Sequence, residues 1–349
     1  MLRLFFPVIG LYYDPFLIFS TGLVGGFISG FLGVGCGVII TPVLMELGVP
    51  PLIAVSSQLC HAVGTNLTNF LSYKRKRDVD FHLAAYILLG GGIGAAYEWF
   101  LLKYSSGSNA VLTKFIYIYA AILIIFGFIM LYQSISEWKD NKHTKHISTV
   151  MMRRWMLYLP FHKVFVRSRT EMSILIPIFI GFLAGLIVAS LGGGNNLFMA
   201  PIITYLIGRI SPVVHGTTAL SGYVITAITS LVYAQSGYCC DLAFVLILFV
   251  GAGLGAFIGV RLSYNIKRSY LNFIAAIVVF LMSSRQIFKL ISNSFTIPFS
   301  QQFDFTKSYF FNLVNKNCIC YTFFCIALIS AIAYIFEKFL QCLANGKRK

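Results

Sequence analysis

Residues 26–42 read GFISGFLGVGCGVIITP, and residues 181–201 read GFLAGLIVASLGGGNNLFMAP. Both stretches open on Gly-Phe-x-x-Gly, continue as an apolar run, reach a cluster of glycines and end at a proline. The clusters occupy residues 33–37 and 192–196. Because glycine adopts backbone angles that other residues avoid, each cluster predicts an interruption between two half-helices. The near-repetition predicts that the chain consists of two related halves.

The duplication continues downstream of the two glycine clusters. Asp80 and Asp241 lie 161 positions apart. At the same offset the glycines of one copy fall on glycines of the other, which places Gly90, Gly92 and Gly94 on Gly251, Gly253 and Gly255. The offset is 159 for the two prolines and 155 for the first glycine of each copy, as expected when the connecting loops differ in length. Duplicated membrane halves of this kind are a recurring transporter architecture.

The composition is that of an integral membrane protein. Of the 349 residues, 58% are hydrophobic and only 11% are charged, with a mean hydropathy of +0.82. Soluble domains carry about a quarter charged residues. Apolar runs of roughly the 20 residues that cross a bilayer predict spans at 52–72, 80–102, 111–133, 213–234, 238–262, 269–288 and 318–337. These runs are too continuous for the alternating strands of a barrel. We therefore expect a multi-pass helical protein of the cell (cytoplasmic) membrane.

The net charge of +16 is interpreted as a topology signal, because the basic residues lie between apolar runs and no soluble domain is left to bind nucleic acid. The positive-inside rule places residues 74–77 and 139–169 in the cytoplasm and the loop at 235–238 outside. This arrangement puts 20 of the 27 lysines and arginines inside. The loop after residue 72 is then inside, whereas its counterpart after residue 233 is outside. The two copies are therefore predicted to be inverted in the membrane.

The predicted fold class is an all-α polytopic membrane protein with two inverted-topology repeats, each opening with a glycine-broken helix pair, plus a C-terminal extra span. Residues 14–133 are assigned to the first transmembrane repeat and 134–173 to a basic cytoplasmic linker. Residues 174–289 are assigned to the second transmembrane repeat. Residues 290–349 are assigned to a polar loop, an extra transmembrane helix and a basic tail.

The sequence offers little sign of N-terminal processing or metal chemistry. Residues 4–13 are apolar, but no small-x-small cleavage site follows and Asp14-Pro15 is typical of a helix start, so we expect the N-terminus to be retained. The eight cysteines form no CxxC pair, and most lie in apolar runs, where cysteine behaves as a small hydrophobic side chain. We therefore expect no metal site, no disulfide and no cofactor.

The glycine clusters are the candidate substrate site. Amides freed at a half-helix N-terminus carry a partial positive charge and can bind an anion without a charged side chain. The alternative is tight helix packing, which we favour for Gly90-x-x-x-Gly94 and for the glycines of 251–259. At the clusters we favour binding, because glycines this dense weaken a helix beyond what packing requires. The residues predicted to bind substrate here are Gly33, Gly35, Cys36, Gly37, Gly192, Gly193, Gly194, Asn195 and Asn196.

A helix with a polar stripe follows each cluster. Polar residues recur every four positions, so that one face of each helix is hydroxylated. The stripe is predicted to line the substrate path through Ser57, His61, Thr65, Thr218 and Thr226. The alternative is that the hydroxyls bond back to the preceding turn. An intramembrane histidine is a functional candidate, although a hydrogen bond from His61 to a neighbouring helix would explain it equally well.

Two acidic residues, Glu46 and Glu98, are further candidates, in this case for proton coupling. An ionisable side chain inside a membrane protein points to function. Each of the two lies near the end of its apolar run, so the alternative is that it reaches water at the interface. Both interpretations stay open from the sequence.

The glycine patterns resemble those of the sulfite exporter TauE/SafE family of membrane transporters. The resemblance rests on G-F-x-x-G-F-L-G-x-G-x-G-x-x-x-x-P from Gly26, on the second-copy G-F-x-x-G followed by S-L-G-G-G, and on GAGLGAFIGVR at 251–261. It covers about residues 16–288. Cys36 stands where the family more often continues its glycine run. The resemblance implies export of small sulfur-containing anions, of the sulfite or organosulfonate class, through a pore between the two halves.

Three functions are compatible with the sequence to different degrees. The first is a transporter that exports a small sulfur-containing anion by alternating access between the two repeats, or one that carries another small anion such as a carboxylate. The second is a membrane enzyme, which is disfavoured because the histidines and carboxylates are scattered. The third is a non-transporting membrane assembly factor. The expected partners are the anionic substrate and membrane lipid, not nucleic acid, and association between copies of the chain stays open.

Overall fold

The computed structural model describes residues 4–32, 36–75, 78–105, 160–165, 170–193, 212–263, 268–291 and 318–345, together with single positions between 121 and 135 and at 199, 202 and 203. The described chain is mostly helical, as predicted. Its helices are α1 (Pro15–Leu32), α2 (Gly37–Glu46), α3 (Pro51–Arg75), α4 (Phe81–Ser105), α7 (Leu175–Leu191), α9 (Pro212–Gln235), α10 (Leu242–Ser263), α11 (Arg268–Ile291) and α13 (Cys318–Asn345). Two short antiparallel hairpins, which the sequence analysis does not predict, are formed by β1 (Leu4–Phe6), β2 (Leu11–Tyr13), β3 (His162–Phe165) and β4 (Thr170–Ser173).

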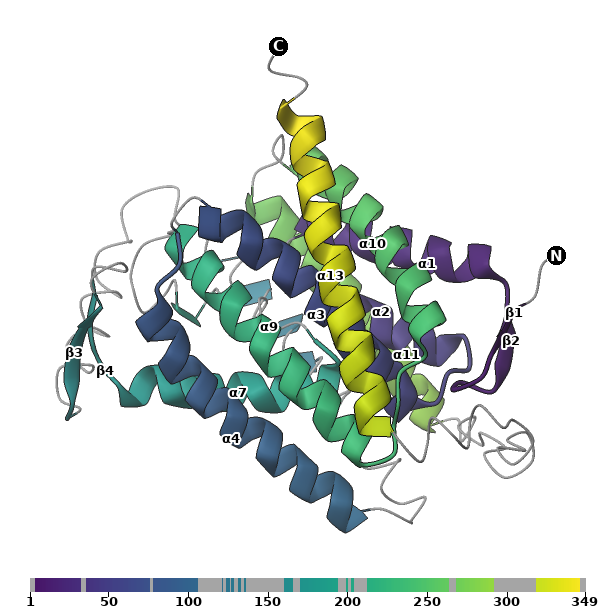
Figure 1. The fold of residues 1–349 in the computed structure, drawn as a ribbon, viewed down its shortest axis with the longest axis horizontal. Helices are drawn as coiled ribbons and strands as arrows, with labels where there is room; N and C mark the ends of the chain where they lie inside the picture. Colours follow the sequence, from purple (N-terminus) through teal and green to yellow (C-terminus); the bar gives the residue numbers. More distant parts are fainter. Residues whose placement is uncertain are drawn as a thin grey trace.

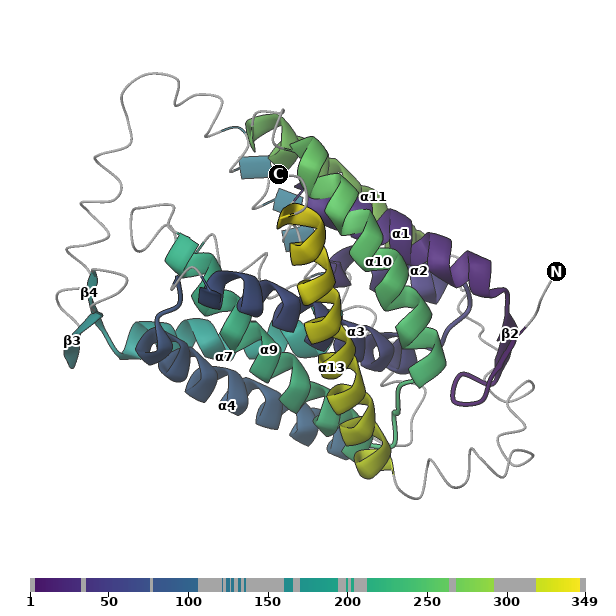
Figure 2. The ribbon, with the colours of Figure 1, turned by 45° about the horizontal axis from the view of Figure 1, so that its top comes forward.

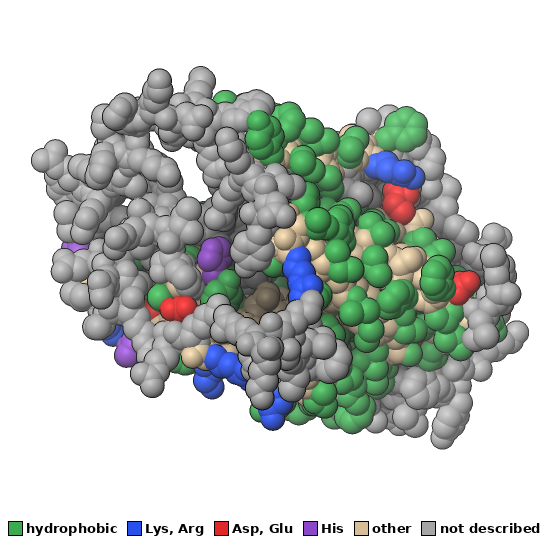
Figure 3. Space-filling view, turned by 90° about the horizontal axis from the view of Figure 1, so that it is seen from above, with side chains coloured by type: hydrophobic (Ala, Val, Ile, Leu, Met, Phe, Trp, Pro, Cys, Tyr) green, Lys and Arg blue, Asp and Glu red, His purple; other side chains and the backbone are tan. Residues whose placement is uncertain are grey.

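Long apolar helices confirm a multi-pass membrane protein. Within the described residues, four helices are long and apolar enough to cross a membrane: Phe81–Phe100, Val213–Gln235, Leu242–Leu262 and Cys318–Lys338. Hydrophobic side chains cover much of the described surface in Figure 3, where charged side chains are sparse. Such a surface suits contact with lipid rather than water. The predicted span at 111–133 and the loop at 292–317 lie largely or wholly outside the described residues.

Glycines hold the helices together in two close pairs. Helix α1 packs along α10 and helix α4 along α7, with α3 and α9 between the pairs (Figure 1). A Cβ atom placed on Gly94 would lie 2.6 Å from the carbonyl oxygen of Phe182, and one on Gly185 would lie 2.6 Å from that of Gly91. Hypothetical Cβ atoms on Gly251, Gly255 and Gly259 would likewise overlap the backbone of α1. The packing interpretation of these glycines is therefore confirmed.

Asp80 and Asp241 begin α4 and α10 in the same way. Asp80 is buried and its Oδ1 accepts the backbone N–H of Leu83 at 3.2 Å, at the start of α4. Asp241 is buried at the start of α10, and its Oδ1 accepts the N–H of Phe244 at 3.4 Å. Its other oxygen accepts the N–H of Val8, in the β1–β2 turn, at 3.2 Å. Both carboxylates thus act as helix N-caps.

Substitutions of Asp241 are expected to separate capping from charge. Burial raises the pKa of this carboxyl, although the N–H groups of Val8 and Phe244 oppose the shift. Its stabilising contribution is therefore present below the unfolded pKa and is lost as the pH rises through the folded pKa. Asp241→Asn keeps a capping oxygen but carries no charge. Its apparent melting temperature, relative to that of the wild type, should therefore be higher at pH 7 than at pH 4. Asp241→Ala should be about 1 kcal/mol less stable than Asp241→Asn at both pH values, because neither variant titrates and only the asparagine keeps a capping oxygen. An unchanged Asn-to-wild-type difference across this range would contradict the argument.

Helix α13 crosses α3 and α9 and is attached at both ends (Figure 2). At its start, Cys318 forms a disulfide with Cys239 of the loop between α9 and α10. Near its other end, a carboxylate oxygen of Glu337 lies 3.5 Å from a guanidinium nitrogen of Arg75 on α3. The expectation that the chain has no disulfide is therefore wrong. Spacing alone did not indicate this pair, because the two cysteines are 79 residues apart.

Candidate functional site

The described helices end at both of the predicted glycine clusters. Helix α1 ends at Leu32 and α2 begins only at Gly37. Helix α7 ends at Leu191, and Gly192 follows in the left-handed conformation, with φ of 75°. Gly193 has φ of 144°, which side-chain-bearing residues rarely adopt. The remaining predicted residues of the two breaks lie outside the described residues: Gly33, Gly35, Gly194, Asn195 and Asn196.

The two breaks meet each other inside the molecule. A Cβ atom on Gly37 would lie 2.9 Å from the Cα of Gly193, so the start of α2 lies against the end of the other broken helix. The hydroxyl of Thr41, one turn into α2, donates to the carbonyl oxygen of Leu191 at 2.8 Å. This bond satisfies one of the carbonyls left without a partner at the end of α7. Positions 150 residues apart in sequence therefore form one junction.

Helix α3 lines this junction with polar side chains. The Nε2 of Gln58 lies 3.2 Å from the Nδ1 of His61 and 3.6 Å from the Sγ of Cys36. The same Sγ lies 3.6 Å from the Nδ1 of His61. Gly192 packs on this helix as well, since its hypothetical Cβ would lie 3.1 Å from the Cβ of Gln58. One turn of α3 thus contacts both breaks.

Three buried polar atoms in this turn lack a hydrogen-bond partner within the described part of the chain. They are the Oγ of Ser57, the Oε1 of Gln58 and the Nε2 of His61. All three side chains have no exposed surface. A buried polar group without a partner costs about 1–3 kcal/mol. Unpaired polar groups beside the meeting point of the two breaks are groups that a polar ligand could pair with.

The start of α2 adds backbone donors to the same place. No side chain caps this N-terminus in the described residues, and Cys36 occupies the capping position. The first amides of a helix carry partial positive charge and favour a negative ligand. The junction therefore combines a helix N-terminus with the unpaired side chains of α3. None of the described residues named for this junction is a lysine or an arginine.

The hydroxyls farther along the predicted stripes bond to their own helices. Thr65 donates to the carbonyl oxygen of Ala62 at 3.1 Å. On α9, Thr218 donates to His215 at 3.1 Å and Thr226 to Gly222 at 2.7 Å. The alternative of back-bonding to the preceding turn therefore describes the geometry of these three threonines. The structure brings His61 to the junction, and Ser57 lies in the same turn of α3. The Thr65 side chain also lies within hydrogen-bonding reach of Cys36. The described hydrogen bonds give no contact of Thr218 or Thr226 with the junction.

The two glutamates occupy different surroundings. Glu46, at the end of α2, lies 3.3 Å from Arg285 of α11, whose side chain is 71% exposed. This contact agrees with the interpretation that Glu46 reaches the interface. Glu98 is buried on α4, which packs on α7 and α9. A role in proton coupling stays a prediction for both.

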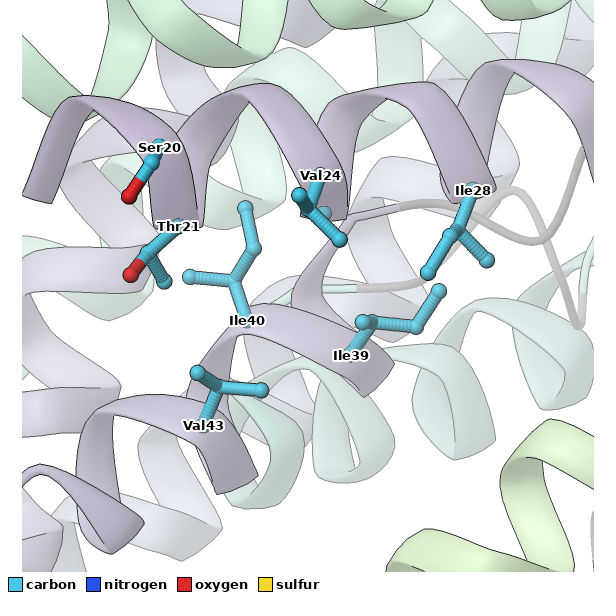
Figure 4. A pocket seen from close by; sticks show the side chains of 8 residues that line it. Ser20, Thr21, Val24, Ile28, Ile39, Ile40 and Val43 are labelled. Carbon is cyan, nitrogen blue, oxygen red and sulfur yellow. The ribbon is translucent and has the colours of Figure 1, made fainter. Parts of the chain in front are cut away.

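A cavity of about 270 Å³ lies between α1 and α2, on a different face of α2 from the junction (Figure 4). Its walls are mostly aliphatic, and Ile39, Ile40 and Val43 form the α2 side. Two hydroxyls also line it, but Ser20 and Thr21 both donate to the carbonyl oxygen of Leu17, at 2.9 and 2.8 Å. The cavity therefore offers an anion little beyond hydrocarbon, and we place the candidate site at the junction.

Sequence reasoning missed two residues of the junction, Gln58 and Thr41. Gln58 stands beside the predicted stripe rather than on it, so the four-residue period passed over it. The residue type could have indicated it, because a glutamine amide is costly to bury in an apolar helix without a partner. Thr41 lies within the apolar half-helix, and its partner is 150 residues away. No local pattern identifies that contact.

Comparison with known proteins gives one consistent result. The family model for "Sulfite exporter TauE/SafE" matches residues 18–285. The "Probable membrane transporter protein YjnA" of Bacillus subtilis is 26% identical over 265 residues, covering 75% of this chain and 95% of that protein. The "Probable membrane transporter protein YunE" of the same organism is 23% identical, covering 77% and 95%. A "Probable membrane transporter protein" of Haemophilus influenzae is 22% identical, covering 78% and 94%. No solved structure matches the chain.

Proposed function

Because the chain belongs to the sulfite exporter TauE/SafE family of membrane transporters, we propose that it exports small sulfur-containing anions, of the sulfite or organosulfonate class, across the cell membrane. The observation that carries the proposal is the junction of the two broken helices. There the N-terminus of α2 and the unpaired polar atoms of α3 meet at one buried point. Such a site binds an anion through dipoles and releases it readily, which suits transport.

The proposed architecture is a pair of inverted repeats, residues 14–133 and 174–289, joined by the basic linker at 134–173 and followed by the extension at 290–349. The helix pairs support it, since α1 packs on α10 as α7 packs on α4, and each pairing joins one repeat to the other. The helix ends support it too, because Asp80 at the end of the α3–α4 connection bonds to Thr217 at the start of α9, at 3.0 Å. Helices α3 and α9 are therefore antiparallel, as corresponding helices of inverted repeats would be.

The disulfide supports the proposed orientation independently of charge. The loop that contains Cys239 carries no lysine or arginine between 235 and 241 and is placed outside by the positive-inside rule. Disulfides persist in oxidising compartments, which lie outside the cytoplasm. The Lys74-Arg75 end of α3, paired with Glu337, belongs to the opposite side. The two signals thus favour the same orientation in the membrane.

The mechanism that we propose is alternating access between the repeats. Ser57, Gln58 and His61 are closed off from solvent, so substrate reaches them only when the halves part on one side. An inside-negative potential favours outward movement of a monovalent anion by about 2.3 kcal/mol per 100 mV. Export therefore needs no coupled ion. Transport of another small anion, such as a carboxylate, is the second candidate, since the described junction offers general anion donors rather than a sulfur-specific ligand.

The purified protein in liposomes should conduct sulfite or a small sulfonate at rates well above protein-free liposomes. The measurement is efflux from loaded vesicles with an imposed potential, positive on the receiving side, and the reverse potential as the internal control. Faster transport of acetate or another carboxylate than of any sulfur oxyanion would favour the second candidate. Absence of flux for every anion would contradict transport and favour a non-transporting assembly factor.

Orientation can be tested by labelling of introduced cysteines. Residues 76 and 236 are expected to react with a membrane-impermeant maleimide from opposite sides of sealed vesicles. The replaced positions flank α3 and α9, so opposite labelling would support inversion. Labelling of both positions from the same side would contradict it.

A further inference from the structure

The unpaired side-chain atoms of this turn of α3 include both hydrogen-bond donors and a hydrogen-bond acceptor. Ser57 contributes a hydroxyl that can donate. The amide of Gln58 donates to the Nδ1 of His61 at 3.2 Å, which leaves the hydrogen of His61 on its unpaired Nε2. The Oε1 of Gln58 is also unpaired and can only accept. Gln58 and His61 therefore offer one donor and one acceptor, and the Ser57 hydroxyl can donate or accept.

This count does not depend on which way the Gln58 amide points. If the amide is rotated by 180°, its oxygen accepts a hydrogen from the Nδ1 of His61, and the amide NH₂ becomes the unpaired donor. The Nε2 of His61 then becomes the unpaired acceptor. In both arrangements, Gln58 and His61 together leave one donor and one acceptor, and Ser57 adds its hydroxyl.

A simple oxyanion satisfies only part of this set. The oxygens of sulfite or of an alkyl sulfonate accept hydrogen bonds, so they pair with the two donors and with the amides of α2. The acceptor of the junction would face those oxygens without a hydrogen between them, and would be buried unpaired. A ligand that carries its own O–H or N–H group beside the anionic group pairs with every member of the set.

The charge of the region limits the ligand further. Residues 16–72 and 174–234 contain a single lysine or arginine, Arg209. A dianion would enter this apolar region with two charges and no cation among the described side chains to offset them. A monoanion is therefore favoured.

On the basis of the proposed function, we propose that the junction selects small monoanionic sulfur oxyanions that also carry a hydrogen-bond donor. Hydrogen sulfite and hydroxyl-substituted short sulfonates belong to this class. Sulfite dianion and plain alkyl sulfonates do not. Buried groups that pair with a substrate hydroxyl discriminate strongly against the analogue that lacks it, because the analogue leaves them unpaired.

Two probes of nearly equal size test the selection. They are 2-hydroxyethanesulfonate and ethanesulfonate, which carry the same charge and differ by one hydroxyl. The ratio of kcat/KM for the two, measured by uptake into proteoliposomes, is expected to be about 10 or more in the wild type. In Gln58→Leu the ratio should fall to about 1, because the variant lacks the amide that would pair with the hydroxyl of 2-hydroxyethanesulfonate. Thr68→Val, on the same helix, is the control, since the Thr68 hydroxyl donates to its own helix at Gly64.

A second variant keeps the test sound if Gln58→Leu fails to fold. Ser57→Ala removes one donor and leaves Gln58 and His61 unchanged. It should lower the flux of both probes by a similar factor and keep their ratio near the wild-type value.

The outcomes separate this inference from the proposed function. Equal transport of the two probes by the wild type would overturn the selection while leaving anion transport in place. An unchanged ratio in folded Gln58→Leu would do the same. Absence of transport for both probes and for hydrogen sulfite would instead overturn the proposed function.

Discussion

Gly90→Leu is expected to abolish the folded protein, whereas Gly92→Leu on the same helix is expected to leave it intact. A Cβ atom on Gly90 would overlap the carbonyl oxygen of Ile178 and lie 2.7 Å from the backbone nitrogen of Phe182. These are backbone atoms of α7, which cannot rotate away. A Cβ atom on Gly92 meets nothing within 4 Å. Overpacking costs about 1–3 kcal/mol where side chains can yield, and we expect more here.

The measurement for this pair is the yield of monodisperse protein in detergent, followed by its apparent melting temperature. Gly92→Leu should match the wild type or exceed it slightly, because leucine favours a helix more than glycine does by up to about 1 kcal/mol. Comparable yield and stability for the two variants would mean that α4 and α7 do not pack as closely as described.

Gly193→Leu is expected to lower anion flux by a factor of about 100 or more in a protein that still folds. A Cβ atom on Gly193 would lie 3.4 Å from the Cβ of Ala62 and 3.6 Å from the Cα of Gly37, which are ordinary contacts. The positive φ adds about 1–3 kcal/mol of strain, so the variant is destabilised but not excluded. The rest of the leucine side chain would occupy the junction where the two breaks meet.

Flux through proteoliposomes checks this prediction, with protein content and the elution profile matched between samples. Gly92→Leu is again the control, because it adds the same side chain away from the junction. Gly193→Ala should fall between wild type and Gly193→Leu. Equal flux in Gly193→Leu and the wild type would remove the second break from the mechanism.

The sequence was informative wherever a feature recurred in both copies. The repeated glycine clusters correctly predicted that α1 ends at Leu32 and α7 at Leu191, because glycine-rich segments weaken a helix. The Gly-x-x-x-Gly spacing correctly predicted close helix pairs. The distribution of hydrophobic residues correctly predicted a multi-pass helical protein. These properties depend on local backbone freedom and on composition, and both can be read from a single sequence.

Features that depend on distant partners were not predictable in this way. The Cys239–Cys318 disulfide and the Thr41–Leu191 bond each join segments that only the fold brings together. The four-residue period pointed to Ser57 and His61 but passed over Gln58, which contacts both Cys36 and His61. The period also selected threonines that bond within their own helices, because periodicity identifies a face of a helix but not what lies opposite it.

Protection of Cys36 from alkylation by the substrate tests the central claim most directly. Cys36 is half-buried at the first break, whereas the free cysteines at 60, 240 and 325 are buried. In a Cys320→Ser, Cys342→Ser variant, the rate of modification by iodoacetamide should fall as 2-hydroxyethanesulfonate is added. The concentration that halves the rate should match the KM for its flux. An alkylation rate that saturating, transported substrate leaves unchanged would show that the anion passes elsewhere than the junction of the two breaks.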